Sequence, residues 1–140
     1  MRKMTYGTWL SIVVFAAVAM GCASGGAGTP TALAPGDMAS LAGTWDGTIT
    51  PPSGGFQPGT LTISPDGQYV ARAGAFAAQG KAQIKDGALM MTSTNTSGGI
   101  SVDPRTSTAR LSQRADGVQV LSGSGHSDAG PFNFEMTRKK

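Results

Sequence analysis

Three Asp-Gly pairs, at 66–67, 86–87 and 116–117, are the feature of this sequence that most restricts its fold. Asp-Gly supplies the positive backbone φ angles that tight hairpin turns require. Each pair lies between two stretches in which apolar and polar residues alternate, and a period of two is typical of strands with one buried face. The sequence therefore predicts three antiparallel hairpins.

The same alternation continues over most of the chain after residue 40. In "LAGTWDGTIT", for example, Leu41, Trp45 and Ile49 fall on one face and threonines on the other. No stretch in this part of the chain keeps a helical apolar period. We therefore predict an all-β domain over 40–140. Its eight expected strands are 41–50, 59–65, 68–73, 80–85, 88–94, 106–113, 118–123 and 131–138.

The connections between these strands favour a barrel. Asp-Gly turns alternate along the chain with longer loops at 51–58, 74–79, 95–105 and 124–130. In an up-and-down arrangement, alternate connections lie at the same end of the sheet. The prediction is a small eight-stranded antiparallel up-and-down barrel with a tight base and a looser mouth, and a β-sandwich is the alternative.

Two places in this domain resemble the lipocalins and their calycin relatives. Gly43-Thr44-Trp45 is similar to the G-x-W motif on the first strand of that superfamily. Arg138 stands where the superfamily has a basic residue, at the end of the last strand, that packs across the tryptophan. The resemblance covers residues 41–140 and implies a calycin-like barrel in which Gly43, Trp45 and Arg138 form the closed base. It does not by itself imply a ligand, because one fold can carry many functions.

The N-terminal residues have the layout of an export signal. A basic pair at 2–3 precedes an apolar run at 9–20, which is shorter than the roughly 20 residues that span a bilayer. Cys22, the only cysteine, follows in "AVAMGCASGG", which resembles the lipobox of bacterial lipoproteins, although Ala19 stands where that motif usually has leucine. An intrachain disulfide is excluded because Cys22 has no partner.

The lipobox resemblance implies that residues 1–21 are a signal peptide and that Cys22 becomes the lipidated first residue of the mature chain. Two or three acyl chains, such as palmitate, would then anchor the protein in the membrane. Ala23, rather than aspartate, follows the cysteine, which implies the outer membrane of the cell envelope. Secretion into the periplasm or beyond and a retained membrane anchor are the alternatives.

Residues 22–39 are rich in glycine, alanine, threonine and proline and show no apolar period, so we expect a flexible tether. The formal net charge of +3 depends on the two basic residues of the leader. Without them, the chain has nine basic and eight acidic side chains. This near neutrality argues against a nucleic-acid partner held through phosphate contacts.

The sequence offers no catalytic constellation. His126 is the only histidine, and we interpret it as an exposed loop residue. A metal site needs three or four suitably spaced ligands, so neither a metal nor another cofactor is expected. We therefore expect a non-enzymatic interaction or structural module of the envelope, whose partner is an envelope protein. The alternative is a carrier that binds a small apolar ligand in the barrel mouth.

An eight-stranded barrel is just wide enough to be filled by side chains or to hold one small ligand. The short strands favour a mostly filled barrel. If a pocket exists, its candidate ligand-binding residues are Trp45 and Tyr69 inside the barrel and Phe56 and Phe76 at its lips. The expected inward-facing residues are Leu41, Trp45, Ile49, Leu61, Ile63, Tyr69, Ile84, Leu89, Met91, Leu111, Val118, Val120, Phe132, Phe134 and Met136.

Overall fold

The computed structural model describes residues 28–97, 105–127 and 129–140. These residues form nine strands, all of them in a single antiparallel sheet, and one short helix. In chain order the elements are β1 (Thr31–Leu33), α1 (Met38–Leu41), β2 (Gly43–Thr50), β3 (Gln57–Ile63), β4 (Gln68–Ala73), β5 (Phe76–Lys85), β6 (Ala88–Ser97), β7 (Arg105–Gln113), β8 (Gln119–Ser127) and β9 (Gly130–Arg138).

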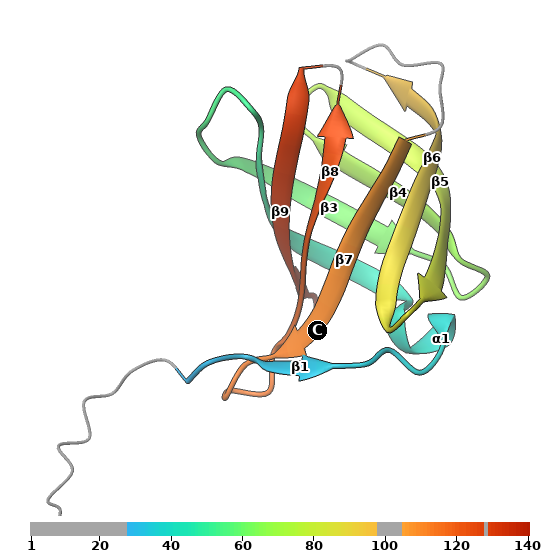
Figure 1. Ribbon diagram of the computed structural model, residues 1–140, viewed down its shortest axis with the longest axis vertical. Coiled ribbons are helices and arrows are strands. Elements are labelled where there is room, and N and C mark those ends of the chain that lie inside the picture. Colours follow the sequence, from blue (N-terminus) through green and yellow to red (C-terminus); the bar gives the residue numbers. More distant parts are fainter. Residues whose placement is uncertain (1–27, 98–104, 128) are drawn as a thin grey trace, which may run out of the picture.

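The strands β2 to β9 close into the eight-stranded up-and-down barrel that the sequence predicts (Figure 1). Each strand pairs with its neighbours in the chain, and the pairing of β2 with β9 joins the two ends of the sheet. The β-sandwich alternative is therefore wrong. Closure joins the first and last strands of the sheet, so no strand of the barrel has a whole edge open for pairing with other chains.

The three Asp-Gly sequences lie at the base, as predicted. At 86–87 both residues have positive φ, 52° for Asp86 and 72° for Gly87, which is the two-residue hairpin turn. The other two connections span four residues, 64–67, and five residues, 114–118, and only their glycines have positive φ. All three are short enough to bring adjacent strands together at this end of the barrel.

Two connections at the mouth are shorter than predicted. Residues 74–75 join β4 to β5 and residues 128–129 join β8 to β9, where we expected loops over 74–79 and 124–130. The ladders continue to Ala73↔Phe76 and Ser127↔Gly130. The strand ends were missed because they are rich in alanine, glycine and serine and show no apolar alternation. The predicted loop at 95–105 falls largely outside the described residues.

The predicted tether is also too long at its C-terminal end. Within 22–39, β1 pairs with β7 in the register Ala32↔Ser112, and Pro35 is buried. The partner of β1 is the last part of β7, beyond Ala109, where the ladder between β6 and β7 ends. The three-residue strand can form here because the last part of β7 offers it backbone hydrogen bonds and Leu33 packs against the barrel core, which composition does not reveal.

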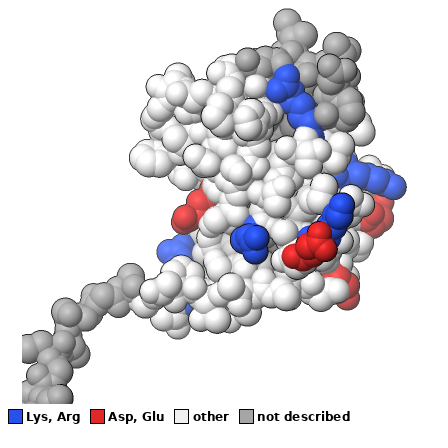
Figure 2. Space-filling model, in the orientation of Figure 1, with Lys and Arg blue, Asp and Glu red and all other residues white. Residues whose placement is uncertain are grey.

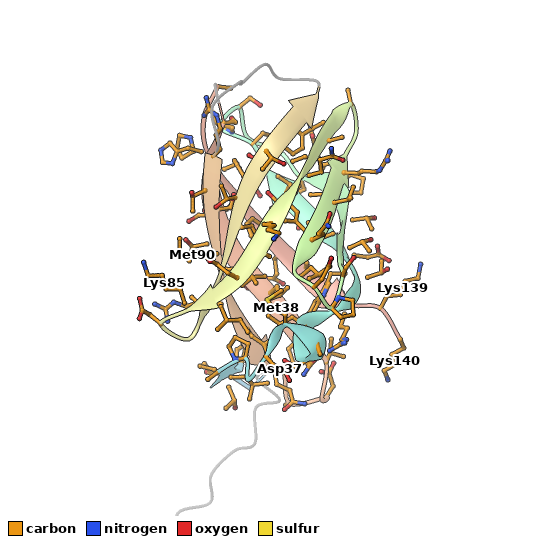
Figure 3. The ribbon with its side chains drawn as sticks, turned by 90° about the vertical axis from the view of Figure 1, so that its right-hand side faces the viewer. Asp37, Met38, Lys85, Met90, Lys139 and Lys140 are labelled. Carbon is orange, nitrogen blue, oxygen red and sulfur yellow. The ribbon has the colours of Figure 1, made fainter. Side chains whose placement is uncertain are left out.

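The helix α1 lies under the barrel and closes the base (Figures 1 and 3). Asp37 caps its N-terminus by accepting a hydrogen bond from the Ser40 N–H at 2.8 Å. Met38 packs against the barrel core from below, and Leu41 is completely buried. Within the described residues, no helix is long and apolar enough to cross a membrane.

Trp45 and Arg138 form the centre of the base, as the calycin resemblance implies. Trp45 is completely buried, and its Nε1–H donates a hydrogen bond to the Leu41 carbonyl at 3.0 Å. The Arg138 guanidinium lies 5.4 Å from the centre of the indole ring. It also donates to the carbonyls of Ser40 and Ala42, at 2.7 and 2.6 Å. Arg138 therefore ties the last strand to the end of α1.

The inward-facing residues agree with the prediction on every strand except β8. Leu121 is completely buried in the core and lies opposite Leu111 of β7. Val120, expected inside, is buried on the other face, and Val118 precedes the strand. The sequence "VQVL" allows either register, and a shift of one residue reverses every side chain on a strand.

Candidate functional site

The mouth half of the barrel contains a cavity of about 300 Å³. The prediction of a mostly filled barrel therefore holds for the base but not for the mouth. The space arises because several inward positions near the mouth carry small side chains, among them Ala71, Ala78, Ser93 and Ser107. Phe76 and Ala129, beside the two short mouth turns, line its outer end.

One wall of the cavity is apolar and aromatic. It is formed by Phe132 and Phe134 of β9 with Ile49 of β2. The centres of the two phenyl rings are 6.3 Å apart and their planes are inclined by 34°.

Two glycines of β8 make room for these rings. Gly123 lies opposite Phe134, and Gly125 lies opposite Phe132. A Cβ atom added at Gly123 or Gly125 would come within 2.6 or 2.7 Å of the facing ring. The glycines therefore let both rings lie close against the sheet, which fixes the aromatic wall in place.

The facing wall carries a row of polar residues. The strand ladders place Tyr69 of β4 opposite Gly80 of β5, Gly80 opposite Ser93 of β6, and Ser93 opposite Arg105 of β7. Tyr69, Ser93 and Arg105 all line the cavity. They therefore stand at one level of the barrel, and Gly80 leaves the position between Tyr69 and Ser93 without a side chain.

These polar groups are held within the protein. The Ser93 side chain is 7 % exposed, and its hydroxyl lies 3.3 Å from both the N–H and the carbonyl oxygen of Arg105. Burial raises the pKa of Tyr69 to about 12, and a side-chain hydrogen bond with Ser93 acts in the opposite direction. The charged form of Tyr69 would be poorly solvated, so its hydroxyl stays neutral to a higher pH than that of an ordinary tyrosine.

Few of the described residues that line the cavity are charged. Among the described residues that line it, Arg105 is the only lysine or arginine, and none is acidic. Figure 2 shows no charged side chain on the upper left of the surface, where Figure 1 shows the loop between β2 and β3. The opening of the cavity is therefore flanked on this side by uncharged surface.

The structure brings together two of the four predicted ligand-binding residues. Tyr69 and Phe76 line the cavity. Trp45 does not, because it lies at the base, four residues before Ile49 on β2, or about 13 Å along a strand. Phe56 does not line it either, since its side chain is 79 % exposed in the loop before β3. Cys22, the predicted lipidation site, lies outside the described residues.

Ser93 and Arg105 were missed by the sequence reasoning, although a signal exists for both. Ser93 continues the inward series of Leu89 and Met91 on β6, and Arg105 is inward by the same alternation from Leu111. Ser93 was passed over because only apolar residues were assigned to the inward face, and Arg105 because it fell at the end of the predicted loop at 95–105.

Neither metal chemistry nor similarity assigns a reaction to this cavity. Within the described residues there is no group of three or more His, Cys, Asp or Glu side chains that could hold a metal ion. His126 is exposed at the cavity rim, near the end of β8 rather than in a loop. Comparisons with protein-family models, curated proteins and solved structures gave no match to this chain.

Proposed function

We propose that this protein is a carrier that binds a small, largely apolar molecule in the mouth of its barrel and does not act as an enzyme. The observation that supports the proposal is the cavity of about 300 Å³, whose size lies at the lower end of the range for small-molecule sites. Its lining combines an aromatic wall with a few polar groups, which is typical of such sites. An interaction or structural module, the other function expected from the sequence, needs no such space.

We also propose that the protein is a lipoprotein of the bacterial outer membrane, lipidated at Cys22. The supporting observations are the leader, the lipobox-like sequence around Cys22 and the near-neutral remainder of the chain. Eight residues lie between Cys22 and Thr31, the first residue of β1, and an extended chain from Cys22 to Thr31 spans about 30 Å. Because β1 lies at the base, the lipid would hold the base toward the membrane and leave the mouth free.

Native mass spectrometry tests the carrier proposal. The chain from residue 23 onward contains every strand of the barrel and can be purified from the producing cells without detergent. We expect a bound small molecule that is released on unfolding. The matched control is Ala78→Trp, which fills the cavity from β5 and should abolish the added mass. Absence of any bound molecule, together with no binding of added apolar compounds, would contradict the proposal.

Labelling with palmitate tests the anchor. The wild-type chain should incorporate the label and sediment with membranes. Cys22→Ser should incorporate none and should accumulate with its leader uncleaved. A wild-type chain that takes up no label would refute lipidation without affecting the carrier proposal.

A further inference from the structure

We propose that residues 31–36, which contain β1, form a releasable clasp that sets how far the barrel can stand from its N-terminal anchor. When the clasp is closed, β1 lies on β7. When it opens, these residues leave the base as an extended segment, while α1 and the eight strands of the barrel stay folded. The effect on reach rests on the proposed lipid at Cys22, whereas the opening itself does not.

The clasp is held by fewer backbone contacts than any strand of the barrel. β1 is the end strand of the sheet and pairs only with β7, over the three residue pairs from Thr31↔Gln113 to Leu33↔Leu111. Each strand of the barrel pairs with two neighbours. Figure 1 shows β1 beneath the barrel, below the end of β7. Since this part of β7 also pairs with β8, opening the clasp breaks one short ladder and leaves the barrel closed.

The side chains of the clasp bury little apolar surface. Thr31 and Ala32 are exposed, Leu33 is half-buried against the core, and Pro35 is buried. Each residue that is held in place loses conformational entropy, and contacts of this kind must offset the loss. Segments with few buried apolar contacts open before the rest of a protein unfolds. We therefore expect the clasp to open more readily than any strand of the barrel.

The opening ends at Gly36. A Cβ atom added at this exposed glycine would have no neighbour within 4 Å, so the backbone has room to turn here. Asp37, the next residue, caps α1, and Leu41 of α1 is completely buried. Arg138 also donates hydrogen bonds to two carbonyls at the end of α1. Gly36 is therefore the hinge between a weakly held segment and a firmly held one.

Opening the clasp changes the reach of the anchor. With the clasp closed, the chain from Cys22 meets the barrel at Thr31 and spans at most about 30 Å. With the clasp open, it meets the barrel at Asp37 and spans at most about 50 Å. Both points lie at the base (Figures 1 and 3). The closed clasp keeps the base near the membrane, and the open clasp lets the barrel contact partners farther away.

Hydrogen exchange followed by mass spectrometry tests the opening on the chain from residue 23 onward. We expect the protected amides of β1 to exchange at least about 100-fold faster than those of β3. Ala32 and Ser112 are partners in the ladder, where the Cα separation of about 4.5–5.5 Å suits a disulfide. Ala32→Cys with Ser112→Cys should slow the exchange of β1 at least about tenfold when oxidised. The same variant in its reduced form is the control, because this chain has no other cysteine.

Two aspartate variants separate the clasp from the barrel. Leu33→Asp places a charge at the half-buried position and should bring the exchange of residues 31–36 to that of an unstructured chain, with β3 unchanged. Thr31→Asp places the same charge at an exposed position and should leave the clasp closed. If β1 exchanges as slowly as β3 in the wild type, or if Leu33→Asp speeds exchange throughout the barrel, the clasp is overturned.

The reach is tested on the full chain, purified from membranes and reconstituted in vesicles. Lys140→Cys at the base carries an acceptor dye, and the bilayer contains a donor lipid. Energy transfer should be lower with Leu33→Asp than with Thr31→Asp, and equal transfer would overturn the effect on reach. A chain that does not stay with the vesicles would refute the lipid anchor, while the exchange rates still decide whether the clasp opens.

Discussion

The base and the mouth of this barrel are formed by the same strands but differ in the size of their inward-facing side chains. Along β6 the inward series runs from Leu89 and Met91 to Ser93. On β8 it runs from Leu121 to Gly123 and Gly125, whose space the phenyl rings of β9 occupy. The base is consequently packed, and the mouth keeps a cavity. Closure of the sheet gives the shape of a container, and the residues at each level decide whether there is room inside.

The largest expected effect is the loss of stability when a buried side chain of the packed base is truncated. Trp45→Ala should lower the free energy of unfolding by about 3–5 kcal/mol, because it removes a completely buried ring and leaves a hole. Phe132→Ala should cost clearly less, because Phe132 is half-buried beside an existing cavity. Urea denaturation of both variants measures the difference.

Arg138→Ala serves as the control for the base. Arg138→Ala removes stacking on the indole that is worth roughly 0.5–2 kcal/mol. It also removes the hydrogen bonds to the carbonyls of Ser40 and Ala42, which water can replace because Arg138 is partly exposed, so the loss should fall below that of Trp45→Ala. Equal losses for Trp45→Ala and Phe132→Ala would contradict the contrast between a packed base and a hollow mouth.

The next largest effect is the pH dependence of stability that follows from the burial of Tyr69 in the polar wall. Burial raises the pKa of Tyr69 from 10.0 to about 12, so the folded protein keeps a proton that the unfolded chain loses near pH 10. Stability should therefore fall between pH 10 and pH 12, by about 2–3 kcal/mol, and this contribution is fully present at lower pH. Subtracting the pH profile of Tyr69→Phe isolates the effect. Identical profiles would show that Tyr69 is as well solvated as a free tyrosine.

The smallest expected effect is a difference in stability between two variants on β5, one in the packed base and one in the mouth. Ala82 and Ala78 are both buried on the inward face of β5, but Ala82 belongs to the packed core and Ala78 lines the cavity. Ala82→Leu should lower stability by about 1–3 kcal/mol through overpacking. Ala78→Leu should change it by less than about 1 kcal/mol, because the added atoms enter free space. Thermal unfolding compares them, and an equal loss in both would mean that the mouth has no usable space.

The sequence by itself determined the strands and the closed base. Period-two alternation and the Asp-Gly pairs are local signals, so most strand ranges agree with the structure. They differ at the mouth, where alanine, glycine and serine replace apolar residues, and at the base, where residues 41–42, predicted to begin the first strand, belong to α1 and its C-cap. Trp45 and Arg138 were paired correctly because they belong to a recognisable motif on the first and last strands of the barrel. The same reasoning placed Tyr69 and Phe76 near a pocket but also placed Trp45 there, since alternation gives the face of a residue and not its height in the barrel.

Only the tertiary structure decided the cavity and its polar row. The register between β5 and β6 shifts at Gln79/Gly80, and beyond this irregularity Gly80 stands opposite Ser93. Tyr69, Ser93 and Arg105 are separated by many residues in the sequence and share a level only through this register. The pairing of β1 with the end of β7 likewise depends on where β6 begins, because the ladder between β6 and β7 reaches only to Leu89↔Ala109. Such features follow from hydrogen bonds between distant strands, whereas the alternation of one strand records only which side of it is buried.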